Sequence, residues 1–139
     1  MKKLIVALFL CIVAGGAGAG VPEGLIAYRA GHYALAIQEL GQAAKAGDAE
    51  AQFLTGASYA SAKPPRKDLV LAESWLMKAA DQRYSQAYYW LGNLYMFLSG
   101  KRDEPKAAPW YKKAAARGHP EGQFLLGMIL FSSKTVPQD

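Results

Sequence analysis

Apolar residues recur at three-and-four spacing along most of the chain, and this pattern predicts amphipathic helices. The clearest stripe lies in residues 68–82 and consists of Ala72, Trp75, Leu76, Ala79 and Ala80. Asp68 stands where an N-cap residue belongs, because its carboxylate can accept hydrogen bonds from the free amides of the first turn. No segment alternates in the manner of a strand. The pattern therefore predicts an all-α fold.

The stripe returns along the chain at a nearly fixed interval. Ala43-Ala44 recurs as Ala79-Ala80 and then as Ala114-Ala115, at steps of 36 and 35 residues. Three glycines keep the same steps: Gly56, Gly92 and Gly127. A period in this range is typical of helical repeat arrays, in which each unit is a helix pair that packs against its neighbours.

Two types of helix alternate in this repeat. The helices with alanine pairs span about residues 32–46 and 68–82, and a third begins at Asp103; their partners span about residues 49–62, 85–99 and 120–133. Each partner helix contains one of the three glycines. A glycine in mid-helix costs about 1 kcal/mol relative to alanine, so three at one phase predict a close approach of the paired helix.

We therefore expect a short right-handed α-solenoid of about six antiparallel helices in residues 31–139. The units are placed at about 31–66, 67–101 and 102–139, after a lead-in at residues 20–30. Pro109 falls inside the third alanine-pair helix and removes one backbone hydrogen bond. We expect that helix to start late or to bend.

Residues 1–19 have the composition of a secretory signal peptide. Met1-Lys2-Lys3 is basic, residues 4–14 are apolar but too few to span a bilayer, and Ala17-Gly18-Ala19 forms a small-x-small cleavage site. We expect cleavage after Ala19, a periplasmic or secreted protein, and no stable membrane span afterwards. A membrane anchor and a buried N-terminal helix are the alternatives.

Export changes the chemistry of the mature chain. Cys11 is the only cysteine and leaves with the signal peptide, so neither a disulfide nor thiol chemistry is expected. Loss of Lys2 and Lys3 lowers the formal net charge from +5 to +3. That balance suits an acidic protein partner but, without a basic stripe, does not indicate nucleic-acid binding.

The repeat residues resemble a known family. The run from Ala87 to Gly92, with Tyr95, Asp103 and Trp110 after it, is similar to the Sel-one-like repeat (SLR), a relative of the tetratricopeptide repeat; residues 51–80 carry a second copy. The resemblance covers about residues 31–139 and implies the same solenoid. It also implies a scaffold, adaptor or regulator that binds another protein, and small exported repeat proteins of this kind can act as immunity proteins.

Catalytic chemistry finds no support in the residue pattern. The chain has no histidine pair at metal-binding spacing, no paired acid cluster and no cysteine-based metal motif, so we expect no catalytic residues, no metal and no cofactor. His32 and His119 are interpreted as solvated turn residues. A cell-wall-related hydrolase is the alternative function, because some secreted SLR proteins act on β-lactams. Those relatives, however, carry a disulfide across each unit.

The partner-binding candidates lie on the glycine-containing helices, which are expected to line the concave face. Phe53, Tyr89 and Phe124 share one phase, where an aromatic serves either packing or binding. The repeat dictates the other candidates less strongly: Asn93, Met96, Phe97 and Met128. Aromatic and methionine side chains dominate the energy of many protein interfaces.

The last predicted helix is apolar almost all round, from Phe124 to Phe131. The terminal unit of a solenoid normally has a polar outer face, because no neighbour covers it. Either the chain is a truncated product or fragment of a larger repeat assembly, or something covers this edge. We expect the cover to be another protein or, through self-association, a second copy of the chain.

Overall fold

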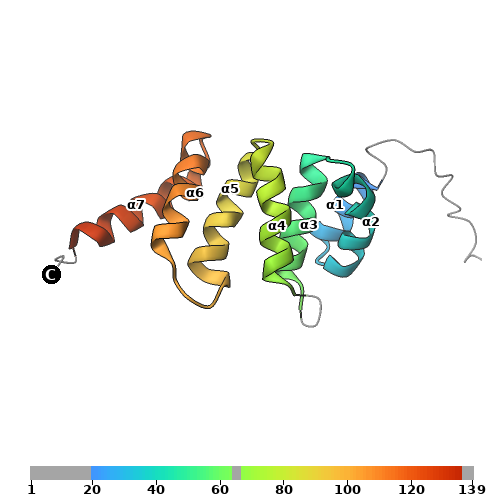
Figure 1. Ribbon diagram of the computed structural model, residues 1–139, viewed down its shortest axis with the longest axis horizontal. Coiled ribbons are helices and arrows are strands. Elements are labelled where there is room, and N and C mark those ends of the chain that lie inside the picture. Colours follow the sequence, from blue (N-terminus) through green and yellow to red (C-terminus); the bar gives the residue numbers. More distant parts are fainter. Residues whose placement is uncertain (1–19, 64–66, 136–139) are drawn as a thin grey trace, which may run out of the picture.

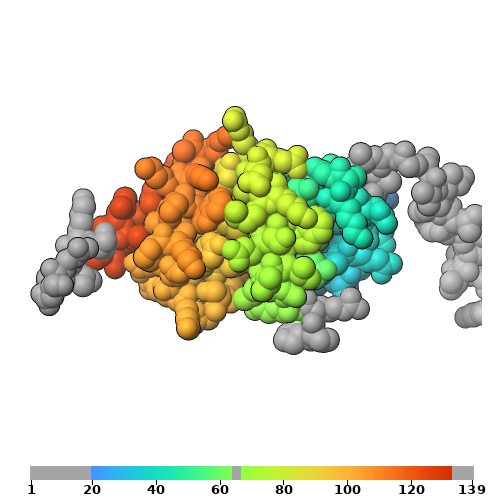
Figure 2. All heavy atoms as spheres, viewed as in Figure 1, coloured from blue at the N-terminus to red at the C-terminus, as the bar shows by residue number. Residues whose placement is uncertain are grey.

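The computed structural model describes residues 20–63 and 67–135; the expected signal peptide, residues 1–19, lies outside them. Seven α-helices follow one another in a row whose last member extends obliquely beyond the end, and no strand occurs in the described residues (Figure 1). The units follow one another along the long axis in chain order (Figure 2). The elements are α1 (Val21–Arg29), α2 (Tyr33–Lys45), α3 (Ala49–Ser61), α4 (Leu69–Asp81), α5 (Ser85–Asn93), the π-helical η1 (Leu94–Leu98), α6 (Glu104–Ala116) and α7 (Pro120–Thr135). The predicted all-α solenoid is therefore confirmed.

Helix α1 accounts for the difference from the six helices expected. It packs against α2 and α3, where the sequence indicated only a lead-in to the repeats. Gly24 of α1 lies against Leu40 of α2, as the glycines of later helices lie against theirs. The α1–α2 pair is thus a shortened unit at the start of the solenoid. Its nine residues fall outside the alanine–glycine period, which is why that period did not reveal it.

One contact recurs between the paired helices. The glycine of the first helix faces a large side chain of the second: Gly24 faces Leu40, Gly56 faces Leu76, and Gly92 faces Tyr111. A Cβ atom at Gly56 would lie 2.8 Å from Leu76 Cγ and 3.0 Å from the Ala72 carbonyl oxygen. The close approach that the mid-helix glycines predicted is present at Gly56 and Gly92.

Alanines frame each of these large side chains. Leu40, Leu76 and Tyr111 have no exposed surface, and an alanine stands four residues before and three residues after each of them. These flanking alanines are also buried: Ala36 and Ala43, Ala72 and Ala79, Ala107 and Ala114. The stripe of the second helix is therefore alanine, large residue, alanine, and it lies on the glycine face of the first.

The turns that end α2, α4 and α6 share one geometry. Each closes with paired backbone hydrogen bonds around a residue of positive φ, the arrangement of a Schellman motif. Gly47 and Gly118 hold this position in two turns, at φ 101° and 78°. Arg83 holds it in the third, at φ 62°, where an L side chain is disfavoured.

The helix starts have the predicted caps at Asp68 and Asp103, and Asp48 caps α3 in the same way. The Oδ1 atoms of Asp48, Asp68 and Asp103 accept from backbone amides three residues on, at 2.8–3.1 Å. Pro109 does not delay α6, which begins at Glu104 and continues through the proline. The amide that Pro109 lacks would have bonded the carbonyl of Pro105 in the first turn, where both prolines are exposed to water. The expectation of a late start is therefore wrong.

Replacement of the interface glycines should destabilise the protein. In Gly92→Ala, the added methyl overlaps the Tyr111 ring, and overpacking of this kind costs about 1–3 kcal/mol. Gly41→Ala in α2 is the matched control, because a Cβ atom there meets no described atom within 4 Å and should raise the free energy of unfolding by up to about 1 kcal/mol. Urea unfolding followed by circular dichroism measures both. Shifts of equal sign would contradict the packing described here.

Substitution of Arg83, which has left-handed backbone geometry, should stabilise the protein, whereas Gly92→Ala should destabilise it. Arg83→Gly should raise the free energy of unfolding by up to about 1 kcal/mol, since glycine adopts positive φ without a Cβ clash but loses more entropy on folding. Thermal unfolding of this variant and of the reverse change at the equivalent turn, Gly118→Arg, provides the comparison. The first should melt higher than the parent protein and the second lower; a parent melting point above both would refute the assignment of strain.

Candidate functional site

Helix α7 closes the described solenoid at its C-terminal end, and one side of it is uncovered (Figure 1). Its inner side packs on α6: Ile129 is buried with Met96, Ala107 and Tyr111, and a Cβ atom on Gly122 would lie 2.9 Å from Ala114 Cβ. Its outer side exposes four large apolar side chains: Phe124, Met128, Leu130 and Phe131.

Comparison with α3, the equivalent helix of an earlier repeat, shows which face of the helix the outer side of α7 is. Phe124 has the phase of Phe53 in α3, yet 67% of Phe124 is exposed against 8% of Phe53. Met128 has the phase of the fully buried Ala57, and it is half exposed. A Cβ atom at Gly127 would meet no described atom within 4 Å. At Gly56 and Gly92, by contrast, a large side chain of the next helix occupies the space beside the glycine. The outer side of α7 is thus the face that α3 and α5 bury.

A shallow groove of about 540 Å³ follows this face. Phe124, Gly127 and Met128 line it, with Phe131 at its far end and Arg102 from the turn before α6. The Arg102 guanidinium is paired with Glu104 at 2.7 Å, so its charge is partly compensated at the rim. We call Phe124, Gly127 and Met128 the α7 surface.

Two of the predicted binding residues lie in the core instead. Phe53 packs against the rings of Tyr84 and Trp90, with centroids 5.2 and 6.4 Å away. Met96 is buried in a cluster with Ala107 and Tyr111. Both side chains therefore serve packing within the chain.

Asn93 and Tyr89 are half-buried and occupied within the chain. The Asn93 Oδ1 atom accepts a hydrogen bond of 2.8 Å from the Tyr111 hydroxyl. Burial, and then the neighbouring Tyr89, raise the pKa of Tyr111, so the phenol remains a donor at neutral pH. Tyr89 stacks on His119 with centroids 4.6 Å apart. His119 is therefore a packed side chain and not the solvated turn residue that was expected.

Phe97 is exposed at the edge of the middle unit. It belongs to η1, where the Ser99 amide donates to the Leu94 carbonyl five residues back, the pattern of a π-helical turn. The sequence predicted a regular helix to residue 99, and the α-helix ends at Asn93 instead. Within this turn Met96 faces the core and Phe97 faces solvent.

The aromatic residues of the middle unit pack on one another. Tyr88 stacks on Trp110 with centroids 6.2 Å apart, and the Lys113 ammonium lies 4.5 Å from the centre of the Trp110 ring. Tyr95 donates a hydrogen bond to Glu73, and burial together with this bond raises the pKa of Tyr95 to about 12. This concentration of aromatics is therefore mainly structural.

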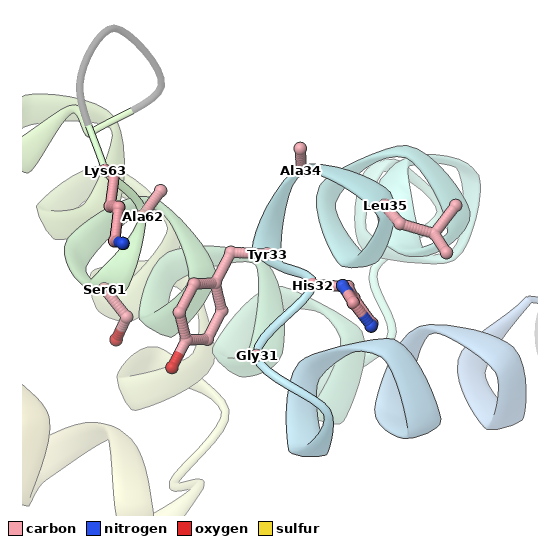
Figure 3. Close-up of a pocket in the computed structure, with 8 residues that line it drawn as sticks. All are labelled: Gly31, His32, Tyr33, Ala34, Leu35, Ser61, Ala62 and Lys63. Atoms are coloured by element: carbon pink, nitrogen blue, oxygen red, sulfur yellow. The ribbon is translucent and has the colours of Figure 1, made fainter.

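A second hollow of about 680 Å³ lies between the start of α2 and the end of α3. Tyr33 extends from α2 toward the Ser61 end of α3, whereas His32 and Leu35 point the other way (Figure 3). No carboxylate lines it, and its remaining wall ends at Lys63, next to residues 64–66, which lie outside the described part. We assign it no function.

In residues 20–63 and 67–135, no three His, Cys, Asp or Glu side chains come together as a metal site would require. Among the helices of the same residues, none combines the length and hydropathy that a membrane crossing requires.

The fold and the repeated glycine contact define an α-solenoid of helix pairs. The model of the Sel1 repeat matches residues 49–84, 85–119 and 120–139, and the chain therefore belongs to the Sel1 repeat family. Each of the first two matches contains a helix pair, α3–α4 and α5–α6. The third contains α7 and no second helix in the described residues.

One solved structure supports the same assignment. A Sel1 repeat protein from Oxalobacter formigenes is similar over 92% of this chain, with 27% sequence identity and a TM-score of 0.66. This chain spans 54% of that protein's length. Among curated proteins, none matches. Sel1 repeats generally mediate protein–protein interaction and are typically not catalytic.

Proposed function

We propose that this protein is an exported interaction module that binds another protein through the α7 surface. The observation that carries the proposal is that Phe124 and Met128 are exposed at the phase where α3 buries its equivalents. Contiguous exposed apolar side chains on a soluble protein mark sites of interaction. An aromatic and a methionine beside a bare glycine backbone provide both contact area and room for close approach.

The proposed location rests on the first nineteen residues. Their basic start, apolar stretch and small-x-small end are the parts of a cleavable export signal. Helix α1 begins at Val21, so cleavage after Ala19 leaves the first helix of the solenoid whole. The mature chain without cysteine is suited to an oxidising compartment, since it has no thiol that could form a wrong disulfide.

Export is tested by expression of the tagged full chain in a Gram-negative host, followed by fractionation and N-terminal sequencing. We expect the protein in the periplasm or the medium with Gly20 as its first residue. Leu8→Arg is the control, because a charge in the apolar stretch blocks recognition of the signal and should leave an uncleaved protein in the cytoplasm. Wild type found uncleaved in the cytoplasm contradicts the proposal.

Partner binding is tested by affinity capture from periplasmic extract with three baits. The double variant Phe124→Glu/Met128→Glu should recover at least about tenfold less of a specific partner than wild type, because two buried charges oppose the contact. Phe97→Glu is the matched control, an exposed aromatic on η1, and should retain the partner. Circular dichroism verifies that each bait is folded.

The control also separates the two candidate surfaces. If a folded double variant retained the partner while Phe97→Glu lost it, the surface around Phe97 and not the α7 surface would be the binding site. If both variants retained every partner, binding through either surface would be refuted.

A further inference from the structure

We infer that the α7 surface binds an amphipathic helix of a partner protein, anchored by a leucine that two alanines flank. The inference rests on the proposed function and deepens it, because it names the chemistry of the partner segment. The anchor occupies the bare backbone at Gly127, between Phe124 and Met128. A leucine is preferred to a tyrosine at this point.

The chain makes the same glycine contact three times. Gly24, Gly56 and Gly92 each face one large side chain of the following helix, and each of those side chains is fully buried. Gly127 is the fourth glycine in this series, and no described atom lies within 4 Å of the position of its Cβ. The α7 surface therefore continues an interface whose occupant is known inside the same molecule.

The helices that pack on Gly24, Gly56 and Gly92 show what shape a helix on Gly127 needs. At Gly56 the Ala72 carbonyl oxygen and the Leu76 amide nitrogen would each lie 3.0 Å from an added Cβ, so the backbone of α4 itself reaches the glycine. Such an approach needs small residues beside the anchor, and Ala72 and Ala79 meet this need in α4. A partner helix on Gly127 must therefore carry alanine four residues before its anchor and three residues after it.

The residue that follows each glycine selects the anchor. Asn93 follows Gly92 and accepts from the Tyr111 hydroxyl at 2.8 Å. Ala57 follows Gly56, and the anchor there is Leu76, which needs no acceptor. Met128 follows Gly127 and offers only a thioether, a weak acceptor. A tyrosine hydroxyl buried against it would lack its partner, which favours leucine.

A second copy of this chain does not have the required segment free. Its three alanine–large–alanine stripes lie in α2, α4 and α6, and their anchors Leu40, Leu76 and Tyr111 are fully buried. Presentation of one of them in trans would require a unit to open. We therefore assign the stripe to another protein.

The experiment uses a labelled synthetic peptide with the sequence of residues 68–83, which carries the Ala72–Leu76–Ala79 stripe. We expect saturable binding to the purified protein, measured by fluorescence anisotropy. Leu76→Ala in the peptide should weaken binding by at least about tenfold, because the anchor side chain is removed. Leu76→Tyr should weaken it as well, and the addition of Met128→Asn to the protein should restore part of the loss by supplying an acceptor.

The protein variants are matched by position. Gly127→Leu places a side chain in the anchor site and should abolish peptide binding, while the absence of described atoms around it leaves the fold intact. Ala116→Leu, at an exposed position of α6, should bind the peptide as wild type does. Circular dichroism and thermal melting verify the fold of both.

Three results would overturn the inference: no saturable binding of the peptide, full binding by a folded Gly127→Leu variant, or equal binding of the leucine and tyrosine peptides.

Sedimentation gives a fourth result that would overturn it: a dimer that Gly127→Leu dissociates would make a second copy of the chain the occupant of the α7 surface. An intact mass beyond residue 139, with a helix on α7, would make the occupant part of the chain. If the peptide fails while Phe124→Glu/Met128→Glu still loses its partner, the proposed function stands and the helical anchor does not.

Discussion

The contact between a helix glycine and one large side chain of the next helix holds the two helices of each unit together. A glycine in a helix costs about 1 kcal/mol relative to alanine. Burial of a leucine side chain stabilises by about 1.5–3 kcal/mol, so the exchange is favourable wherever the glycine lets the side chain in. Leu40, Leu76 and Tyr111 are fully buried for this reason. At Gly127 the helix bears the cost of a glycine, but no described side chain is buried against it. A side chain from another molecule would supply the missing burial.

The two ends of the described solenoid differ in how they meet this constraint. At the start, α1 supplies the glycine and α2 the leucine, so the pair is complete within the chain. At the other end, α7 supplies a glycine with apolar neighbours and no partner helix among the described residues. Units of a solenoid contact only their neighbours, and a terminal unit therefore has half the contacts of an internal one. Among the described helices that carry such a glycine, α7 is therefore the one whose glycine face has no partner helix.

Local features of the fold could be read from the sequence, and features that depend on neighbours could not. The caps at Asp68 and Asp103 were predicted because a cap involves residues three positions apart. The burial of Met96 and the exposure of Phe97 were not predicted, since the π turn that begins at Leu94 shifts the phase of both residues relative to the preceding α-helix. Phe53 and Phe124 share a phase, so the phase alone does not distinguish the covered side chain from the exposed one. The place of Phe124 in the last, almost wholly apolar helix is what indicated an unmatched edge. The period of the glycines did locate the helix face that Gly127 shares with Gly56 and Gly92.

The open end also links binding to stability. Because an end unit of a repeat array gains from one neighbour only, its helices open at lower free energy than those inside. An occupant on the α7 surface supplies the second neighbour and stabilises the folded form in proportion to its affinity and concentration. Ile129 and Leu125 already hold the inner side of α7 on the cluster around Tyr111. The terminal helix is thus formed without a partner, so binding at the proposed surface would require little ordering of the protein's own backbone, and the fit of the proposed anchor would chiefly determine the affinity.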